Sequence, residues 1–397
     1  MRHLPAQVWI ISVATLINRS VGFLALFSAI YFQSFDRPAN VVTLALLVVG
    51  VAGVLGAMAG GWIAERVGPG AVLSIGSLVN VPLLIILAML GGNIVASILV
   101  TAISVAVSQS FVGPSAAVVS ASTDQVSTVT LFAFYRIFLN VGSVVAPALA
   151  GIFGLGNFRL LFLLSAAGSF VAFVLLSTTL RGSGARAAAE PEEDGAVDDS
   201  MAEPDSQRWR IWTVIAVFGV TIAIYAQHQS GIPLSVERLP EGARLYAILL
   251  LINPIVIIVA ELPLSTVTAR LKWGNAYGIG IFATAVGLAI CGVSGSWALC
   301  IAAFVLFSVG EAIFAPLANS SIATLSKPQH NARYQGYLSA AQSLGIALGP
   351  AIGAWGVLHN RSLFWIAVAV LGAVLAAVSV FAGTGRKSSR EPVQVPA

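Results

Sequence analysis

The sequence predicts an all-α polytopic membrane protein, with twelve transmembrane helices in two pseudo-symmetric six-helix bundles. Composition is the first reason: only 9% of the 397 residues are charged, 58% are hydrophobic, and the mean hydropathy is +0.93. A soluble domain carries roughly 25% charged residues, because its surface must meet water. Most of this surface must therefore meet lipid. The other two reasons are a count of apolar segments and an internal repeat.

Apolar segments follow one another along the whole chain, separated mostly by short stretches that hold Gly, Pro, Asn or charge. A helix needs about 20 mostly apolar residues to span a bilayer. Twelve segments meet this length: 7–33, 41–63, 70–90, 93–119, 129–153, 158–180, 209–233, 244–269, 275–294, 297–324, 332–357 and 362–384. The basic start at Met1–Arg2–His3 runs into the first of them without a cleavage site, so we expect no cleaved signal.

Lysine and arginine placement predicts a cell-membrane protein with both termini in the cytoplasm, because basic residues collect on the cytoplasmic side. With a cytoplasmic N-terminus, thirteen of these residues fall in segments on the cytoplasmic side: Arg2, Arg66, Arg181, Arg186, Arg208, Arg210, Arg270, Lys272, Lys327, Arg333, Arg386, Lys387 and Arg390. Five fall outside: Arg37, Arg159, Arg238, Arg244 and Arg361. Net charge is +4, but these residues are scattered, so no nucleic-acid partner is indicated.

One long polar segment divides the chain. Residues 181–208 hold eight acidic residues between Glu190 and Asp205 and few apolar groups, which predicts a flexible cytoplasmic linker. The predicted domains are therefore an N-terminal bundle over 1–180, this linker, a C-terminal bundle over 209–385 and a cytoplasmic tail over 386–397.

The two halves repeat each other at a nearly constant offset. Arg66 and Arg270 follow the second and eighth spans, 204 residues apart. The stretches beginning at Pro114 and Pro316 are 202 apart, and Gly142–Pro147 and Gly345–Pro350 are 203 apart. Two matching bundles around a midplane cavity are an architecture for alternating access.

The loop after the second span carries a family resemblance. Gly61, Glu65, Arg66 and Gly68 stand at the positions of the Gly-x-x-x-Asp-Arg-x-Gly motif, and the chain resembles the major facilitator superfamily over its full length. Glu65 replaces the usual Asp, and Pro69–Gly70 stand where basic residues are usual. The resemblance implies the major facilitator fold and a gating role for these four residues, with Arg270 as their counterpart in the second half.

Two further patterns are similar to the bacterial drug:proton antiporter branch of that family, which has twelve helices. One is the run from Asn140 and Gly142 to Pro147 in span five. The other is Gly310–Glu311 to Pro316, followed by Arg333-Tyr334-x-Gly336. They imply proton-coupled efflux, with membrane lipids, protons and a small molecule as partners, and function as a monomer.

Four charged residues lie within predicted spans: Arg19, Arg136, Glu261 and Glu311. A charge at the bilayer centre costs about 2.5–3.5 kcal/mol even on insertion scales, so each one is a functional candidate. Because there are two acids and two bases, mutual neutralisation that merely holds the bundle together is the alternative.

Glu311 lies near the middle of span ten, and its counterpart in the first half is Gln109. A desolvated carboxyl favours its protonated form, so Glu311 is a candidate proton carrier. Glu261 precedes Pro263, which loosens the helix and suits a moving gate. A permanent ion pair for Glu311 and snorkelling to the inner surface for Glu261 are the alternatives.

Arg19 lies halfway along span one and must point inward, toward an acid or an anionic substrate group. Arg136, beside Tyr135 and one turn from Asn140, is a cavity cation or a partner for an acid. Polar residues expected to line the same cavity are Tyr135, Asn140, Gln109, Asn253 and Gln227. His228 near the outer end of span seven is expected to be solvated, with a proton-shuttling role as the alternative.

Other functional classes are disfavoured. The sequence has no P-loop and no serine nucleophile elbow. Its four histidines are dispersed and its two cysteines lie in apolar stretches, so we expect no metal, no cofactor and no enzyme activity. Proton-coupled efflux of small, partly apolar compounds is the leading hypothesis. The alternatives are transport of a defined solute, such as a sugar or amino acid, and a lipid-handling or sensory role without coupled transport.

Overall fold

The computed structural model describes the chain except for residues 1–3, 37, 123–125, 154–156, 181–204 and 384–397. Most of the predicted linker and the predicted tail therefore lie outside the described residues. The first half contains α1 (Ala6–Ser20), α2 (Phe23–Gln33), α3 (Ala39–Val67), α4 (Pro69–Met89), α5 (Ile94–Gln109), α6 (Val112–Ala121), α7 (Thr128–Phe153) and α8 (Phe158–Leu180). The second half contains α9 (Asp205–Tyr225), η2 (Ala226–Gln229), α10 (Gly231–Val236), α11 (Gly242–Thr268), α12 (Trp273–Val293), α13 (Trp297–Leu325) and α14 (Pro328–Gly383).

These helices account for all twelve predicted spans. Ten described helices are long and apolar enough to cross a membrane. One of them, the 56-residue α14, is two helices joined at Asn360, whose extended backbone (φ −157°, ψ 93°) interrupts it. The first span makes the twelfth, because it is broken at Val21–Gly22 into α1 and α2, each too short to cross alone.

Three spans that the sequence predicts as continuous are interrupted. Span one breaks at Val21–Gly22, span four at Ser110–Phe111, and span seven tightens into the 3₁₀ turn η2. The ends of α1 and α9, Ser20 and Tyr225, are 205 residues apart, close to the offset of the sequence repeat. Breaks of this kind at matching places in two repeats are typical of transporters, in which interrupted helices surround the substrate.

Local sequence explains the helix ends. Gly68 has φ +85°, a backbone conformation that glycine adopts without strain, and it ends α3 while Pro69 begins α4. Asn93 and Ser296 cap α5 and α13, because their side-chain oxygens accept hydrogen bonds from the N–H groups of Ala96 and Leu299 at 3.1 and 3.3 Å.

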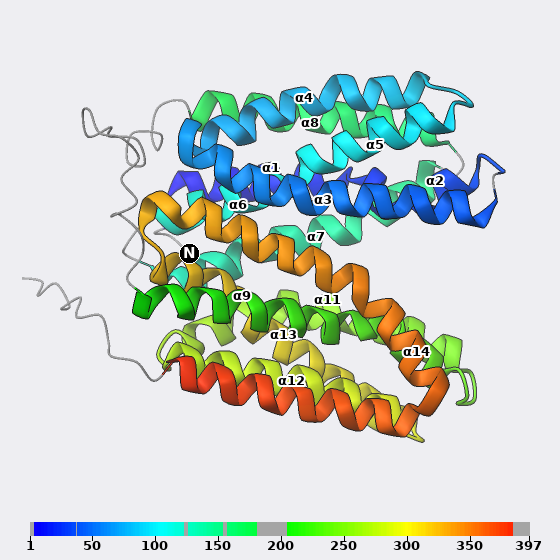
Figure 1. The fold of residues 1–397 in the computed structure, drawn as a ribbon, viewed down its shortest axis with the longest axis vertical. Coiled ribbons are helices and arrows are strands. Elements are labelled where there is room, and N and C mark those ends of the chain that lie inside the picture. Colours follow the sequence, from blue (N-terminus) through cyan, green and yellow to red (C-terminus); the bar gives the residue numbers. More distant parts are fainter. Residues whose placement is uncertain (1–3, 37, 123–125, 154–156, 181–204, 384–397) are drawn as a thin grey trace, which may run out of the picture.

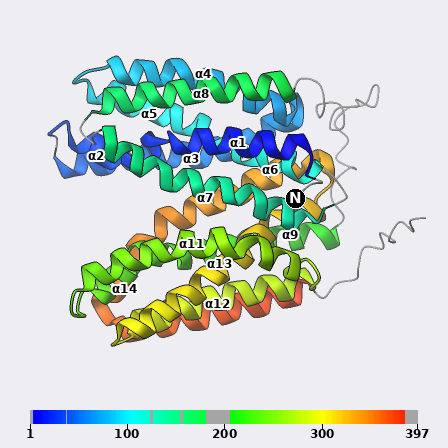
Figure 2. The same cartoon turned by 180° about the vertical axis from the view of Figure 1, so that it is seen from behind.

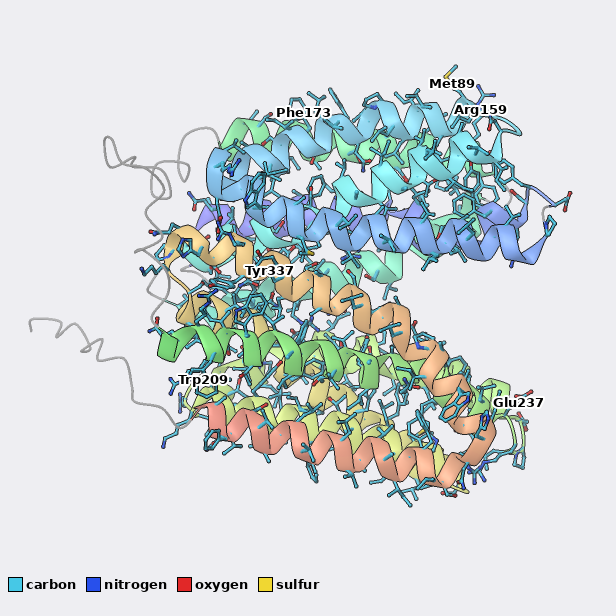
Figure 3. All side chains as sticks on the ribbon, in the orientation of Figure 1. Met89, Arg159, Phe173, Trp209, Glu237 and Tyr337 are labelled. Atoms are coloured by element: carbon cyan, nitrogen blue, oxygen red, sulfur yellow. The ribbon has the colours of Figure 1, made fainter. Side chains whose placement is uncertain are left out.

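The helices form two groups, α1–α8 and α9–α14, which lie side by side in Figure 1 and, seen from behind, in Figure 2. We call the end with the α3–α4 turn the Gly68 end, and the end with the bend in α14 the Asn360 end. Figure 3 shows Arg159 and Glu237 at the Asn360 end and Trp209 at the opposite one. The two groups approach each other at the Gly68 end and diverge toward the Asn360 end (Figure 1).

Glycines permit the close approach. A Cβ atom at Gly61 of α3 would lie 2.5 Å from the Ala332 carbonyl oxygen and 2.9 Å from Arg333 Cα, both on α14. The relation is reciprocal, because a Cβ at Gly336 would lie 2.7 Å from the Ala57 carbonyl oxygen. Real Cβ atoms do not come this close, so only glycine lets the two backbones meet here.

The outer surface fits lipid. Leu47 and Leu55 on α3 are 61% and 59% exposed, and Trp355 on α14 is 65% exposed. These side chains would be costly on a protein surrounded by water, but hydrocarbon solvates them well.

Candidate functional site

An ion triad joins the two halves of the molecule. Arg136 on α7 donates from Nε to Glu261 Oε1 on α11 at 2.5 Å, and from Nη2 to Glu311 Oε1 on α13 at 3.2 Å. The arginine comes from the first half and both acids come from the second. Three of the four charged residues predicted within spans therefore form one site.

Neighbouring polar groups hold the second acid in place. Asn253, two turns before Glu261 on α11, donates from Nδ2 to Glu311 Oε2 at 2.8 Å and to Ser308 Oγ at 3.3 Å. Tyr225 and His228, at the end of α9 and in η2, lie close enough to Glu311 to interact with its charge. Glu311 thus has a donor on each carboxylate oxygen.

Burial makes the charge of the triad important. The side chains of Arg136, Glu261 and Glu311 are 17%, 0% and 9% exposed. One cation faces two acids, so the fully ionised triad carries a net charge of −1. Moreover, Glu261 Oε2 is buried without a hydrogen-bond donor in the described part of the chain. An unsatisfied buried oxygen and a net negative charge are both costly in a buried site.

His228 corrects a prediction. We expected a solvated side chain near the outer end of span seven, but His228 is 6% exposed, and its Nδ1 lies 2.6 Å from the Tyr225 carbonyl oxygen. Its ring packs against Tyr225 and Phe307. The 3₁₀ turn at Ala226–Gln229 is the reason, because it turns the histidine inward instead of continuing the helix toward the outer end.

Gln227 is predicted to line the cavity, and in this conformation its amide is engaged elsewhere. Its Nε2 donates to the carbonyl oxygens of Ala223 and Gly349, both at 2.8 Å, and its Oε1 accepts from Ser230 at 3.3 Å. These bonds tie η2 to α14. Asn140, one turn from Arg136, has a buried Nδ2 without an acceptor among the described residues, so its amide is not committed.

The predicted gating residues lie at the Gly68 end. Glu65 on α3 forms an ion pair with Arg333, close to the N-terminus of α14, and Arg66 stacks over the Trp62 ring at 3.6 Å. A second link between the halves lies nearby, where Asn331 Nδ2 donates to Ser120 Oγ at 2.7 Å. Arg270 lies in the exposed turn after α11 and forms no ion pair within the described residues.

A cavity of about 340 Å³ with a mixed polar and apolar lining lies inside the first half. Three predicted site residues, Arg19, Gln109 and Tyr135, line it. Within the described chain it is separate from the ion triad, so the predicted substrate-binding residues fall into two groups: these three, and those around Arg136 and Asn253.

The sequence analysis missed several polar partners. Asn80 accepts from Ser104 Oγ at 2.5 Å and donates to Ser108 Oγ at 3.0 Å, which links α4 to α5 along the cavity. The position of Asn80 within an apolar span could have predicted that it has a buried polar partner. Asn331 gave no such signal, because it lies in a polar turn in the sequence.

Comparison with known proteins agrees with this geometry. Residues 8–276 and 242–397 match the family model described as Major Facilitator Superfamily. The chain is 22% identical over 352 residues to the uncharacterized MFS-type transporter YqjV of Bacillus subtilis (strain 168), which covers 87% of this chain and 85% of that one.

Solved structures share the fold. A bacterial homologue of the iron transporter ferroportin, in an outward-facing state, superposes with a TM-score of 0.69 at 14% identity, covering 95% of this chain and 98% of that one. The transporter FucP, in its outward conformation, gives 0.68 at 13% identity with the same coverage. The human organic anion transporter MFSD10 gives 0.66 at 15% identity, covering 94% and 100%.

The fold and the family match together define a membrane-embedded secondary transporter. The chain belongs to the Major Facilitator Superfamily.

Proposed function

We propose that this protein exports small, partly apolar compounds from the cell in exchange for protons, by alternating access. The observation that carries the proposal is the bridge from Arg136 to two acids of the opposite half. Any rocking of the two halves must strain or break this bridge, so its charge state controls the motion. This is the property that coupling requires.

Proton uptake would weaken the bridge. With both acids ionised, Arg136 is attracted to two carboxylates across the interface. When one carboxyl binds a proton, one of these attractions falls to that of an ordinary hydrogen bond. Glu261 is the favoured acceptor in this conformation, because its Oε2 is free while both Glu311 oxygens have donors.

The gate would follow the same motion. The Glu65–Arg333 pair and the glycine contacts around Gly61 close the Gly68 end in this conformation. With that end in the cytoplasm, as the distribution of basic residues favours, the closed contacts would form the inner gate. A proton entering from outside would loosen the triad and allow the Gly68 end to open inward.

Export is favoured over uptake by the resemblance of Asn140–Pro147 and Gly310–Pro316 to the drug:proton antiporter branch. The similar structures carry different cargo according to their titles. The fold therefore leaves the substrate open, and transport of a defined solute is the competing function.

Reconstitution tests the coupling. A growth-inhibition panel in a strain that lacks its own pumps identifies an exported compound, which is then loaded into proteoliposomes carrying the purified protein. An imposed pH gradient should drive its flux. Glu261→Gln and Glu311→Gln should each abolish the gradient-driven flux but retain substrate binding, whereas Glu241→Gln, at an exposed surface pair, should behave as wild type.

Two results would contradict the proposal. Flux that ignores the pH gradient would indicate uncoupled movement and support the lipid-handling or sensory alternative. Gradient-driven flux that survives in both glutamine variants would remove the triad from the mechanism.

A further inference from the structure

The cavity in the first half has features of a binding site. Helices α1, α4, α5, α7 and α8 all contribute to its wall, and its volume of about 340 Å³ is near the lower end of the range for small-molecule pockets. Apolar side chains such as Leu73 and Leu84 share the wall with many serines and amides. A cavity of this size and lining fits a small ring system that carries one polar group.

Among the described residues, Arg19 is the only charged one that lines this cavity. Within the described residues it forms no ion pair, in contrast to Arg136, which has two acidic partners. Its side chain is exposed, so the cavity is accessible at this point. The charge of Arg19 is therefore available to a ligand and not committed to the fold.

Contacts with neighbouring segments hold the main chain of Arg19 in place. Arg19 lies in the last turn of α1, just before the break at Val21–Gly22, and the Gly22 N–H donates to the Arg19 carbonyl oxygen at 3.2 Å. The Val21 carbonyl oxygen, at the break, accepts hydrogen bonds from the Phe23 N–H at 2.9 Å and from Ser165 Oγ on α8. On the opposite side Gly142 of α7 packs against Arg19, where a Cβ atom would come within 2.6 Å of Arg19 Cβ.

The remaining polar groups suggest how a ligand would be held. The amide of Asn80 is occupied by Ser104 and Ser108. Gln109 and Asn18 also line the cavity, and their side chains have no hydrogen-bond partner within the described chain. They can donate to the oxygen atoms of an anionic group while Arg19 supplies the charge.

We propose that the cavity binds organic anions, with a sulfonate or carboxylate group on Arg19 and an apolar body against Leu73 and Leu84. This deepens the proposed function, on which it rests for the fate of the ligand, by naming its substrate class. Arg19 has no acidic partner among the described residues, so the anionic group of a ligand can pair with it through charge-assisted hydrogen bonds.

Helix α7 connects this site to the ion triad. Tyr135, Leu139 and Ser143 line the cavity at intervals of four residues, so they share one face of the helix. Arg136 is the next residue after Tyr135 and reaches the acids of the other half. A ligand that shifts α7 would therefore act directly on the proton-binding site.

Binding to the purified protein in detergent, without any gradient, tests the proposal independently of coupling. The probes are naphthalene-1-sulfonate, its neutral sulfonamide, and the cation 1-naphthylmethylamine, which share one ring system and differ in charge. Affinity is measured by isothermal titration calorimetry. We expect the sulfonate to bind at least tenfold more tightly than either of the others.

Variants locate the site. Arg19→Gln should weaken sulfonate binding at least tenfold, and Arg19→Lys should retain part of it, because lysine keeps the charge but not the forked geometry. Arg159→Gln is the matched control, since it removes an exposed arginine at the far end of the same half. Unfolding temperatures of all variants show whether each is folded.

Equal affinity for the three probes, or sulfonate binding that is unchanged in folded Arg19→Gln, would overturn the anion site. Either result would leave the proton-coupling proposal intact, because that proposal concerns Glu261 and Glu311. Conversely, wild-type protein that binds the sulfonate but shows no flux driven by the pH gradient would refute the coupling proposal and retain this site.

Discussion

Arg136 Nε lies 2.5 Å from Glu261 Oε1, and this contact crosses from the first half of the chain to the second. Glu261 is fully buried, with no surface accessible to solvent. Because the same guanidinium also binds Glu311, a single side chain on α7 holds two helices of the other half.

Removing this arginine should destabilise the protein in a pH-dependent way. Arg136→Gln leaves two buried acids without their cation, which costs about 3–5 kcal/mol when one partner of a buried pair is lost. Protonation relieves that cost, so the variant should recover stability as pH falls from 8 to 5.5, relative to wild type. Unfolding temperature in detergent measures the difference.

The control for this prediction is Arg244→Gln, which breaks an exposed pair with Glu241 and should shift stability little at any pH. An Arg136→Gln variant whose deficit is the same at both pH values would show that the two acids are not left ionised together.

The gate pair should control access to the Gly68 end. Glu65→Gln and Arg333→Gln each remove a partly buried ion pair that holds this end closed. In a background with Cys291→Ala and Cys300→Ala, a cysteine replacing Ala117, which is buried in this interface, should react faster with maleimide when either gate variant is added.

A charge exchange checks the interpretation. Glu65→Arg combined with Arg333→Glu restores an ion pair across the same interface, so labelling should slow again relative to either single exchange. Additive effects in this cycle would mean that the two residues act separately.

The sequence was sufficient for the architecture because the bilayer imposes simple rules. Length and hydropathy predicted the spans, and the offset between Arg66 and Arg270 revealed the repeat. Arg136, Glu261 and Glu311 were identified as candidate site residues because they are charged and lie within spans, where only functional or paired charges are tolerated.

The sequence did not predict which acid pairs with which arginine. Two acids and two bases suggest mutual neutralisation, but the structure places both acids on Arg136 and leaves Arg19 without an acid among the described residues. That choice depends on how α7, α11 and α13 pack across the interface. Likewise, no proline lies at Val21–Gly22 to predict the break in span one. The inward direction of His228 depends on the local 3₁₀ geometry, which the sequence pattern did not predict.

The glycine contact between α3 and α14 should be intolerant of side chains. Gly61→Val would introduce atoms where the Ala332 carbonyl oxygen and Arg333 Cα already lie, at a cost of about 1–3 kcal/mol for overpacking. Because the contact exists only while the Gly68 end is closed, the substitution should favour opening and raise maleimide reactivity at Ala117→Cys.

Gly50, on the same helix, is the matched control, because a Cβ there would meet nothing within 4 Å. Gly50→Ala should leave the labelling rate unchanged. Equal rates for Gly61→Val and Gly50→Ala would indicate that the closed Gly68 end is not the dominant state in solution.

Gly142 offers a way to move Arg19 without changing any charge. A Cβ at this position would lie 2.6 Å from Arg19 Cβ and 3.1 Å from the Leu16 carbonyl oxygen, so Gly142→Ala must push α1 and α7 apart. We expect several-fold weaker binding of naphthalene-1-sulfonate, with little change for its neutral sulfonamide. Gly50→Ala is the control, because a Cβ there would meet nothing within 4 Å. If Gly142→Ala weakened both probes equally, the change would reflect the shape of the cavity alone, and the position of the Arg19 charge would not set its preference for anions.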